Sequence, residues 1–154
     1  MEGRALDLEG VGIVVIDTAG VDRVHFGSPL PDPPGMGRRI AQANGMTFFD
    51  PEGNERGGVG YLDNGRAVLV LDNDGGEGAA IYSFASGEVG IGLLRRGEFR
   101  ALMQHHAEAD STTLELNDAS GRTRARLGVG ASGGSALELV NEEGEVCRVV
   151  EPDR

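Results

Sequence analysis

The residue types that carry out most enzymatic chemistry are scarce in this sequence. It has no tryptophan, one cysteine, two tyrosines and three histidines among 154 residues. A single cysteine excludes an intrachain disulfide and a zinc site built on cysteines. Cys147 lies in an alternating strand pattern, so we interpret it as a packed thiol and not as a nucleophile. We therefore predict that the protein is not an enzyme and needs no cofactor.

Basic residues and long apolar runs are also few. Fourteen Lys and Arg face 25 Asp and Glu, for a formal net charge of −11. This balance argues against a nucleic-acid-binding protein and against a polybasic membrane-surface protein. The apolar run Val11–Ile16 is too short for a signal peptide, and no stretch approaches the ~20 apolar residues of a membrane span. We expect a cytoplasmic protein with no transmembrane segment and no nucleic-acid partner.

Glycine, in contrast, is abundant, with 26 residues, and six glycines recur at regular spacing. After a first gap of 33 residues the spacing is 22 to 24, the period of a repeat architecture. In five of six cases an Asp or Asn stands three residues before the glycine, where it caps a tight turn while the glycine takes a positive φ. The glycines are Gly20, Gly53, Gly75, Gly97, Gly121 and Gly144, and the caps are Asp17, Asp50, Asp72, Asp118 and Asn141. The fourth turn lacks a cap, and we expect it to be one residue shorter.

The segments beside these turns alternate apolar and polar residues, as half-buried antiparallel strands do. Before the five capped turns, apolar pairs stand four and two residues ahead of the cap: Ile13/Val15, Met46/Phe48, Val68/Val70, Leu114/Leu116 and Leu137/Leu139. In the shorter fourth unit Ile91 and Leu93 take these places. Six residues after each glycine stands Phe26, Val59, Ile81, Met103, Leu127 or Val150. The best helix candidate is 97–109, but its place in the repeat predicts a strand through Met103 with a less regular tail.

The predicted fold is all-β, one domain spanning residues 1–154, with six antiparallel hairpins of about 23 residues. Because a lone hairpin is barely stable and open edges invite aggregation, we expect a shallow closed barrel or a radial array. A β-trefoil, which also has six hairpins, is the alternative. The one insertion is 28–44, whose four prolines cannot donate to a strand ladder.

Residues 24–60 carry a more specific pattern, with F-D-P-E-G-N-E-R-G-G at 49–58 followed by hairpins of the form L-x-L-x-D-x-x-G-x-x-R. The chain resembles an uncharacterised bacterial family of β-hairpin-repeat proteins that shares both motifs. That family is similar to the β-flower, a shallow barrel likened to the lipid-binding tubby C-terminal fold. The resemblance implies a shallow barrel and a small apolar or lipid-like ligand, and it implies no catalytic residue.

Arginines form the candidate binding site. They recur three residues after the turn glycine, at Arg23, Arg56, Arg100 and Arg124, and the insertion adds Arg38 and Arg39. The functional interpretation is a rim of guanidinium groups that binds an anion or an acidic partner. The structural interpretation is cross-strand pairing, in which Arg124 faces Glu115.

Three further motifs are better explained by structure than by chemistry. His105 and His106 precede Glu108 and Asp110, but adjacent strand residues point to opposite faces, so one metal ion does not easily take both. The run 72–75 resembles the start of a calcium loop but lacks the glutamate such a loop needs. The Gly-rich stretch 128–134 has neither the lysine nor the helix of a phosphate-binding loop. We predict no metal site.

These observations leave three hypotheses. The first is a non-catalytic binding or interaction module for an unknown small molecule or protein, with contacts from residues 29–39 and one rim. The second is a structural, self-associating protein in which the Pro-rich segment is an oligomerisation arm. The third, least favoured, is a metal-dependent enzyme around His105 or His106.

Overall fold

The computed structural model describes residues 12–32, 39, 41–74 and 76–150. In this part of the chain there are twelve β-strands and no helix, which confirms the all-β class. The strands are β1 (Ile13–Ile16), β2 (Asp22–Gly27), β3 (Ala43–Phe49), β4 (Glu55–Leu62), β5 (Arg66–Asn73), β6 (Gly76–Phe84), β7 (Val89–Arg95), β8 (Glu98–His106), β9 (Ser111–Asn117), β10 (Thr123–Val129), β11 (Ser135–Val140) and β12 (Val146–Val150).

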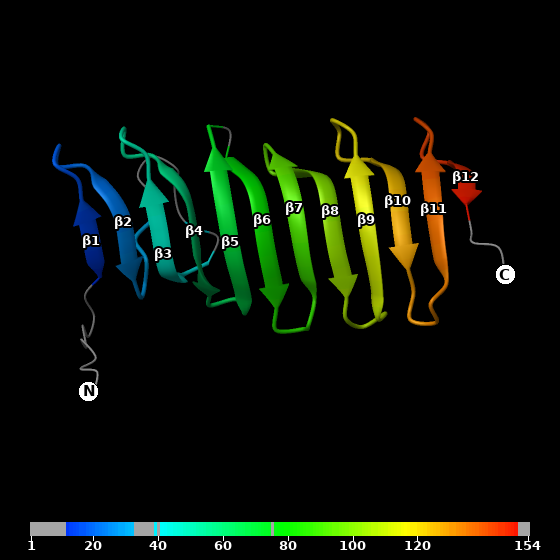
Figure 1. The fold of residues 1–154 in the computed structure, drawn as a ribbon, viewed down its shortest axis with the longest axis horizontal. Helices are drawn as coiled ribbons and strands as arrows, with labels where there is room; N and C mark the ends of the chain where they lie inside the picture. Colours follow the sequence, from blue (N-terminus) through cyan, green and yellow to red (C-terminus); the bar gives the residue numbers. More distant parts are fainter. Residues whose placement is uncertain (1–11, 33–38, 40, 75, 151–154) are drawn as a thin grey trace.

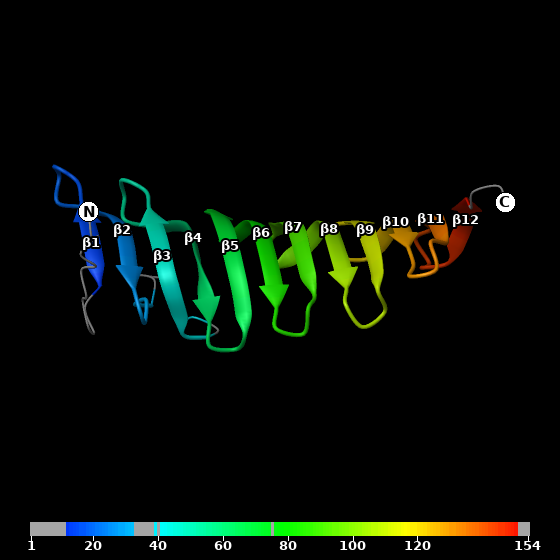
Figure 2. The same cartoon turned by 60° about the horizontal axis from the view of Figure 1, so that its bottom comes forward.

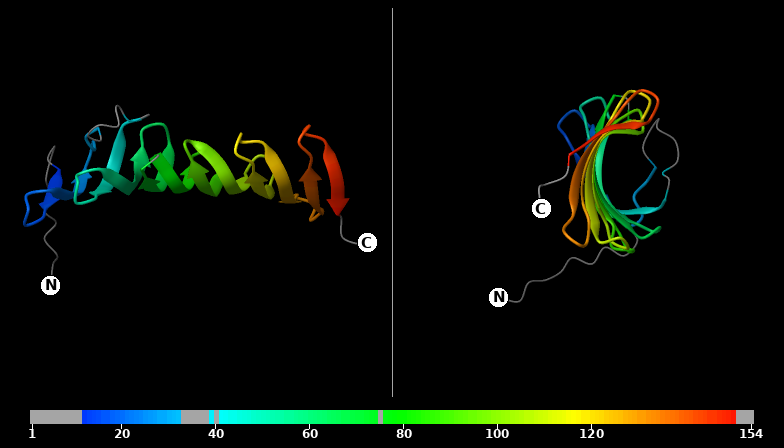
Figure 3. Two further views of the ribbon diagram at one scale, coloured as in Figure 1. Left: turned by 90° about the horizontal axis from the view of Figure 1, so that it is seen from above. Right: turned by 90° about the vertical axis from the view of Figure 1, so that its right-hand side faces the viewer.

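All twelve strands belong to one antiparallel sheet whose spatial order is the chain order, β1 to β12 (Figure 1). The six hairpin turns lie at one end of the strands, here called the turn end, and the five links between hairpins lie at the other end (Figure 2). Seen end-on, the sheet is bent into an arc (Figure 3). Strands β1 and β12 lie at opposite ends, so the described part of one chain is an open sheet and not the closed barrel expected from the sequence. Its uninterrupted order also differs from a β-trefoil.

The capped turns form as their residue types dictate. Asp118 accepts hydrogen bonds from the backbone N–H groups of Ser120 at 2.8 Å and Arg122 at 3.2 Å, and Gly121 has φ 79°. Equivalent side-chain caps are made by Asp17, Asp50 and Asn141. The fourth turn is shorter, as predicted, because Arg95 pairs with Glu98 around a two-residue loop of Arg96 and Gly97, both at positive φ.

The predicted cap at Asp72 is wrong. Strand β5 continues through Asp72, which pairs with Glu77, and ends at Asn73, which pairs with Gly76. Because the loop of this third hairpin begins only after Asn73, the strand register differs by one residue from the prediction. Leu69 and Leu71, and not Val68 and Val70, therefore share a face with Ile81.

Every hairpin has a β-bulge at the same place, on the strand that follows the turn. A bulge inserts one unpaired residue and redirects its side chain. The residue skipped by the pairing is Arg23, Arg56, Gly78, Arg100, Arg124 or Cys147. The predicted pair of Arg124 and Glu115 is wrong, because Arg126 stands opposite Glu115. The register differs by two residues: the bulge adds one, and the turn closes one residue later than expected, between Asp118 and Arg122.

The segment considered as a possible helix is strand β8. It continues beyond Met103 to His106, which pairs with Ser111 of β9. The helix propensity of this segment is overridden because the backbone of β8 pairs with a strand on each side, β7 and β9. The prediction of a strand through Met103 is confirmed, and the predicted irregular tail begins three residues later than expected.

One face of the sheet, here called the aliphatic face, carries an unbroken row of apolar side chains. Each member stands directly opposite the next on the neighbouring strand, one from every strand. The row is Ile13, Phe26, Met46, Val59, Leu69, Ile81, Ile91, Met103, Leu114, Leu127, Leu137 and Val150. Except in β5, where Leu69 takes the place predicted for Val68 and Val70, the row is built from the apolar residues that the alternation predicted.

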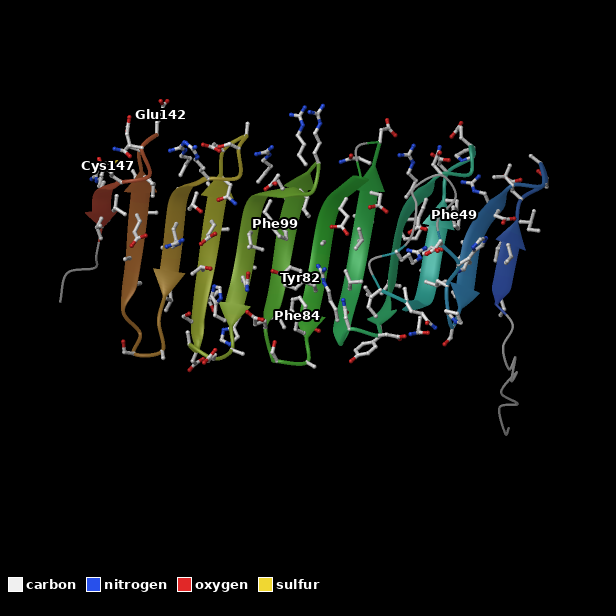
Figure 4. All side chains as sticks on the ribbon, turned by 180° about the vertical axis from the view of Figure 1, so that it is seen from behind. Phe49, Tyr82, Phe84, Phe99, Glu142 and Cys147 are labelled. Carbon is white, nitrogen blue, oxygen red and sulfur yellow. The ribbon has the colours of Figure 1, made fainter. Side chains whose placement is uncertain are left out.

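The opposite face, here called the insertion face, is covered in part by the chain itself. Leu30 of the insertion packs against Ala43 and Leu62, and its N–H donates to the carbonyl oxygen of Ala43 at 2.7 Å. On the middle strands the ring of Tyr82 lies over Gly90. Tyr82, Phe84 and Phe99 lie in this central region, and Phe49 lies on the strands nearer the N-terminal end (Figure 4).

Candidate interaction surfaces

The aliphatic face is the largest feature of the molecule that lacks a partner within the chain. Eleven of the twelve members of its row are 37 to 50% exposed, and Met46 is half-buried. Soluble monomers rarely expose a contiguous apolar patch of more than a few hundred Å², and a larger patch marks an interaction site. An apolar row that runs from one edge of a twelve-stranded sheet to the other therefore indicates a surface made for contact.

A second row on the same face alternates large and small side chains. Leu93 stands opposite Ala101, and Leu116 stands opposite Ala125. Beside the first row, over β4 to β9, lies a shallow hollow of about 650 Å³ whose lining is almost entirely apolar. Large side chains next to small ones make ridges and grooves, the relief that two packed sheets need.

The insertion is fastened to the sheet by an ion pair. Arg39 donates two hydrogen bonds to the carboxylate of Glu55, at 3.0 and 2.6 Å, and a third to the carbonyl oxygen of Pro31 at 3.0 Å. Glu55 is only 7% exposed. Between the insertion and the sheet is a hollow of about 290 Å³ whose lining includes Leu30, Arg39 and Asp72. The described part of the insertion thus contacts its own sheet.

The surroundings of Asp72 raise the pKa of its carboxyl group. Partial burial, followed by the negative charges of Glu55 and Glu77, raises the pKa of Asp72 to about 6. The positive charges of Arg39 and Arg56 oppose that shift but do not cancel it. A carboxyl group with this pKa changes its charge near neutral pH, and sequence reasoning missed it because Asp72 was assigned to a turn.

Four of the arginines predicted to form an anion site lie at the bulges, near the turn end of the strands. Their guanidinium groups already have hydrogen-bond partners. Each reaches the next hairpin along the sheet: Arg23 bonds the carbonyl oxygen of Phe49 at 3.1 Å, and Arg56 bonds the carboxylate of Asp74 at 2.6 Å. Arg100 donates to the carbonyl oxygen of Asp118, and Arg124 to that of Asn141. The structure therefore places these four residues as connections between hairpins, and their binding of an anion stays a prediction.

Three of these arginines also hold the cap of their own turn. The carboxylates of Asp17, Asp50 and Asp118 accept from Arg23, Arg56 and Arg124 respectively. Partial burial raises the pKa of Asp50, but hydrogen bonds from Asn54 and Arg56 outweigh it and lower the pKa to about 2. Hydrogen bonds from Ser120 and Arg124 likewise hold the pKa of Asp118 well below its usual range.

The remaining candidates are placed as follows. Arg38 lies outside the described residues. His105 is on the aliphatic face, 3.3 Å from the hydroxyl of Thr112, and His106 is on the insertion face, 3.2 Å from the hydroxyl of Thr113. The structure thus separates the two imidazoles. Within the described ranges no three His, Cys, Asp or Glu side chains are grouped to hold a metal ion. The same ranges hold no helix that could cross a membrane.

Two further structural features were not found from the sequence. The first is the Arg39–Glu55 ion pair, which joins the insertion to strand β4. No local sequence motif predicts a pair between residues in two different elements. The second is the set of bulges. An arginine three residues after four of the six turn glycines marks the bulge position in the sequence, but alternation alone gives no sign that strand pairing skips this residue. Comparison with known proteins adds nothing to these observations, since no family model and no curated protein matches the chain.

Proposed function

We propose that the protein is a non-catalytic interaction module whose aliphatic face buries an apolar partner surface. One observation carries the proposal, namely that all twelve strands contribute an apolar residue to a single row and eleven of these residues are exposed. Exposure of so much apolar surface is unfavourable in water by roughly 25 cal/mol per Å². A partner bound to the aliphatic face would remove this apolar surface from water and so lower that free-energy cost. The arrangement of apolar residues in the sheet suits such an interaction.

The described part of one chain does not form the closed barrel expected from the sequence. A single chain leaves the sheet open, and a partner on the aliphatic face would enclose that face as a barrel interior is enclosed. Such an assembly would be in keeping with the shallow-barrel family that the motif at 49–58 resembles. A cytoplasmic location, supported by the lone cysteine, and the absence of a nucleic-acid partner, supported by the charge of −11, are parts of the same proposal.

The hypothesis that the Pro-rich segment is an oligomerisation arm receives less support. Leu30 and Arg39, the best-placed contacts within it, are both engaged by the sheet of the same chain. We therefore assign association to the aliphatic face. A small apolar molecule in the 650 Å³ hollow is the second candidate, because the lining of that hollow offers almost no polar group to a ligand.

The test combines sedimentation velocity with binding of the dye 1-anilinonaphthalene-8-sulfonate. The proposal expects the wild-type protein either to sediment as an assembly or to enhance the fluorescence of the dye, and expects the variant Ile81→Glu to change whichever signal is present. A small ligand would appear as lipid-like material in an organic extract of the purified protein. A wild-type protein that sediments as one chain and leaves the dye at its free fluorescence contradicts the proposal.

A further inference from the structure

The isolated chain has little interior for its size. Among the described residues, seven apolar side chains are buried and 24 large apolar side chains are exposed. A folded monomer normally buries most of its large apolar side chains. Exposed apolar residues in this number are the raw material of an obligate interface, which buries about 1,000 Å² or more on each partner.

The length of the aliphatic row limits what can cover it. Twelve strands at a spacing of about 4.8 Å extend over more than 50 Å. The hollow that a small molecule could enter covers only β4 to β9, and would leave β1 to β3 and β10 to β12 exposed. A partner that covers the whole row needs an apolar surface of the same length, and this chain itself has one.

We infer that the partner is a second copy of this chain, packed aliphatic face to aliphatic face. This inference rests on the proposed function and names its partner. The two sheets would lie about 10 Å apart with their strands within about 30° of each other, as in other sheet pairs. A two-fold axis makes such a contact self-complementary, so each row packs on the row of the other copy.

Charge supports a second copy in spite of the net charge of −11. Among the described residues, the two rows on the aliphatic face contain no Asp or Glu, although the chain has 25. Their one charged member is Arg148, which stands opposite Leu139 at the end of the second row. Glu115, Arg126 and Glu138 form their ion pairs on the insertion face. Two aliphatic faces therefore meet without burying a carboxylate, which would be costly without a partner.

The experiment is light scattering coupled to size-exclusion chromatography on the full chain, with two variants matched in exposure. Ile81→Glu places a carboxylate in the middle of the aliphatic row, at a position 50% exposed. Val149→Glu places the same group on the insertion face, at a position 49% exposed. We expect the wild type and Val149→Glu to have twice the 16.1 kDa mass of one chain, and Ile81→Glu to have half of the wild-type mass with its β-type circular dichroism retained.

A wild-type mass of one chain, or of an odd number of chains, overturns the inference, because face-to-face packing joins copies in pairs. So does an Ile81→Glu variant that keeps the wild-type mass. If that variant does not fold, spin labels on Leu114→Cys in the Cys147→Ser background replace it. The distance is then measured between the spin labels on residue 114 of the two copies. A distance longer than about 40 Å, the limit for two packed sheets that each carry a label, overturns the inference. A one-chain wild type that binds the dye through Ile81 would leave the proposed function standing and remove only the second copy.

Discussion

Arg39 holds the carboxylate of Glu55 through two hydrogen bonds of 3.0 and 2.6 Å, and so joins the insertion to strand β4. Both side chains are largely buried, at 18% and 7% exposed. A buried pair of this kind contributes little when it is compared with apolar residues of the same shape, but the loss of one partner leaves a charge without compensation. The pair is therefore the position at which a single substitution in the insertion should matter most.

Substitution Arg39→Ala should lower the free energy of unfolding by about 3 kcal/mol, because it leaves Glu55 buried and unpaired. The double variant Arg39→Ala with Glu55→Gln should recover about half of that loss, since it removes the uncompensated charge. Urea denaturation at one protein concentration measures both effects. Arg95→Ala, at an exposed arginine, is the control and should change the free energy by less than about 0.5 kcal/mol. An Arg39→Ala variant as stable as this control would show that the pair does not fasten the insertion.

Substitution Gly92→Ala should destabilise the sheet, because an added Cβ would lie 2.3 Å from an edge carbon of the Phe99 ring. The ring must tilt away from the strand, and overpacking of this kind costs about 1–3 kcal/mol. Gly128→Ala is the matched control on the same face, where the nearest atom, a methyl carbon of Thr113, is 3.9 Å away.

Thermal and urea unfolding should place Gly128→Ala at or slightly above the wild type, since alanine reduces the entropy of the unfolded chain. The prediction fails if the two alanine variants have the same stability. Neither glycine has a positive φ, so backbone strain does not enter the comparison.

Substitution Asp72→Asn should stabilise the protein at neutral pH and not in acid. Burial and the charges of Glu55 and Glu77 raise the pKa of Asp72 to about 6 from 3.8. The folded state thus binds the proton more tightly than the unfolded state, so the contribution of Asp72 is fully present below pH 3.8 and is lost as pH rises through 6. Solvent screens a half-buried group, so the gain at pH 7.5 should be about 1 kcal/mol.

The measurement is a series of urea denaturations of Asp72→Asn and the wild type from pH 4 to pH 8. The difference in unfolding free energy should grow between pH 4 and pH 6 and remain level above pH 7. Glu142→Gln removes an exposed carboxylate and should give no such trend. A constant difference across the series would mean that the protonation of Asp72 is the same in the folded and unfolded states.

Local chemistry explains how much of this fold could be predicted from the sequence. Asx residues and glycines determine a turn within four or five residues, so Asp17, Asp50, Asp118 and Asn141 were identified as caps and the short loop at Arg96 was anticipated. Asp72 misled the prediction because two neighbouring residues, Asp72 and Asn73, both satisfy the cap pattern, and only pairing with β6 decides between them.

The arrangement of the hairpins could not be predicted in the same way. Alternation reports which side chains share a face, and the residues six positions after each turn glycine do share one, from Phe26 to Val150. It contains no information on whether that face meets another part of the same chain. The residue opposite Glu115 was also beyond local reasoning, because the bulge at Arg124 and the later closure of the turn each change the count by one residue without changing the residue types around them.

The bulges also give the array of hairpins a direction. Each arginine at a bulge reaches forward to the hairpin that follows it, and at the corresponding place in the final hairpin stands Cys147, whose thiol donates to Leu139 of the preceding strand, within its own hairpin. A duplicated unit spliced in after β10 would receive its anchor from Arg124. One placed after β12 would find a thiol at this position, as the fourth hairpin finds only Gly78 of the third, so it would join the sheet through backbone pairing without an arginine anchor.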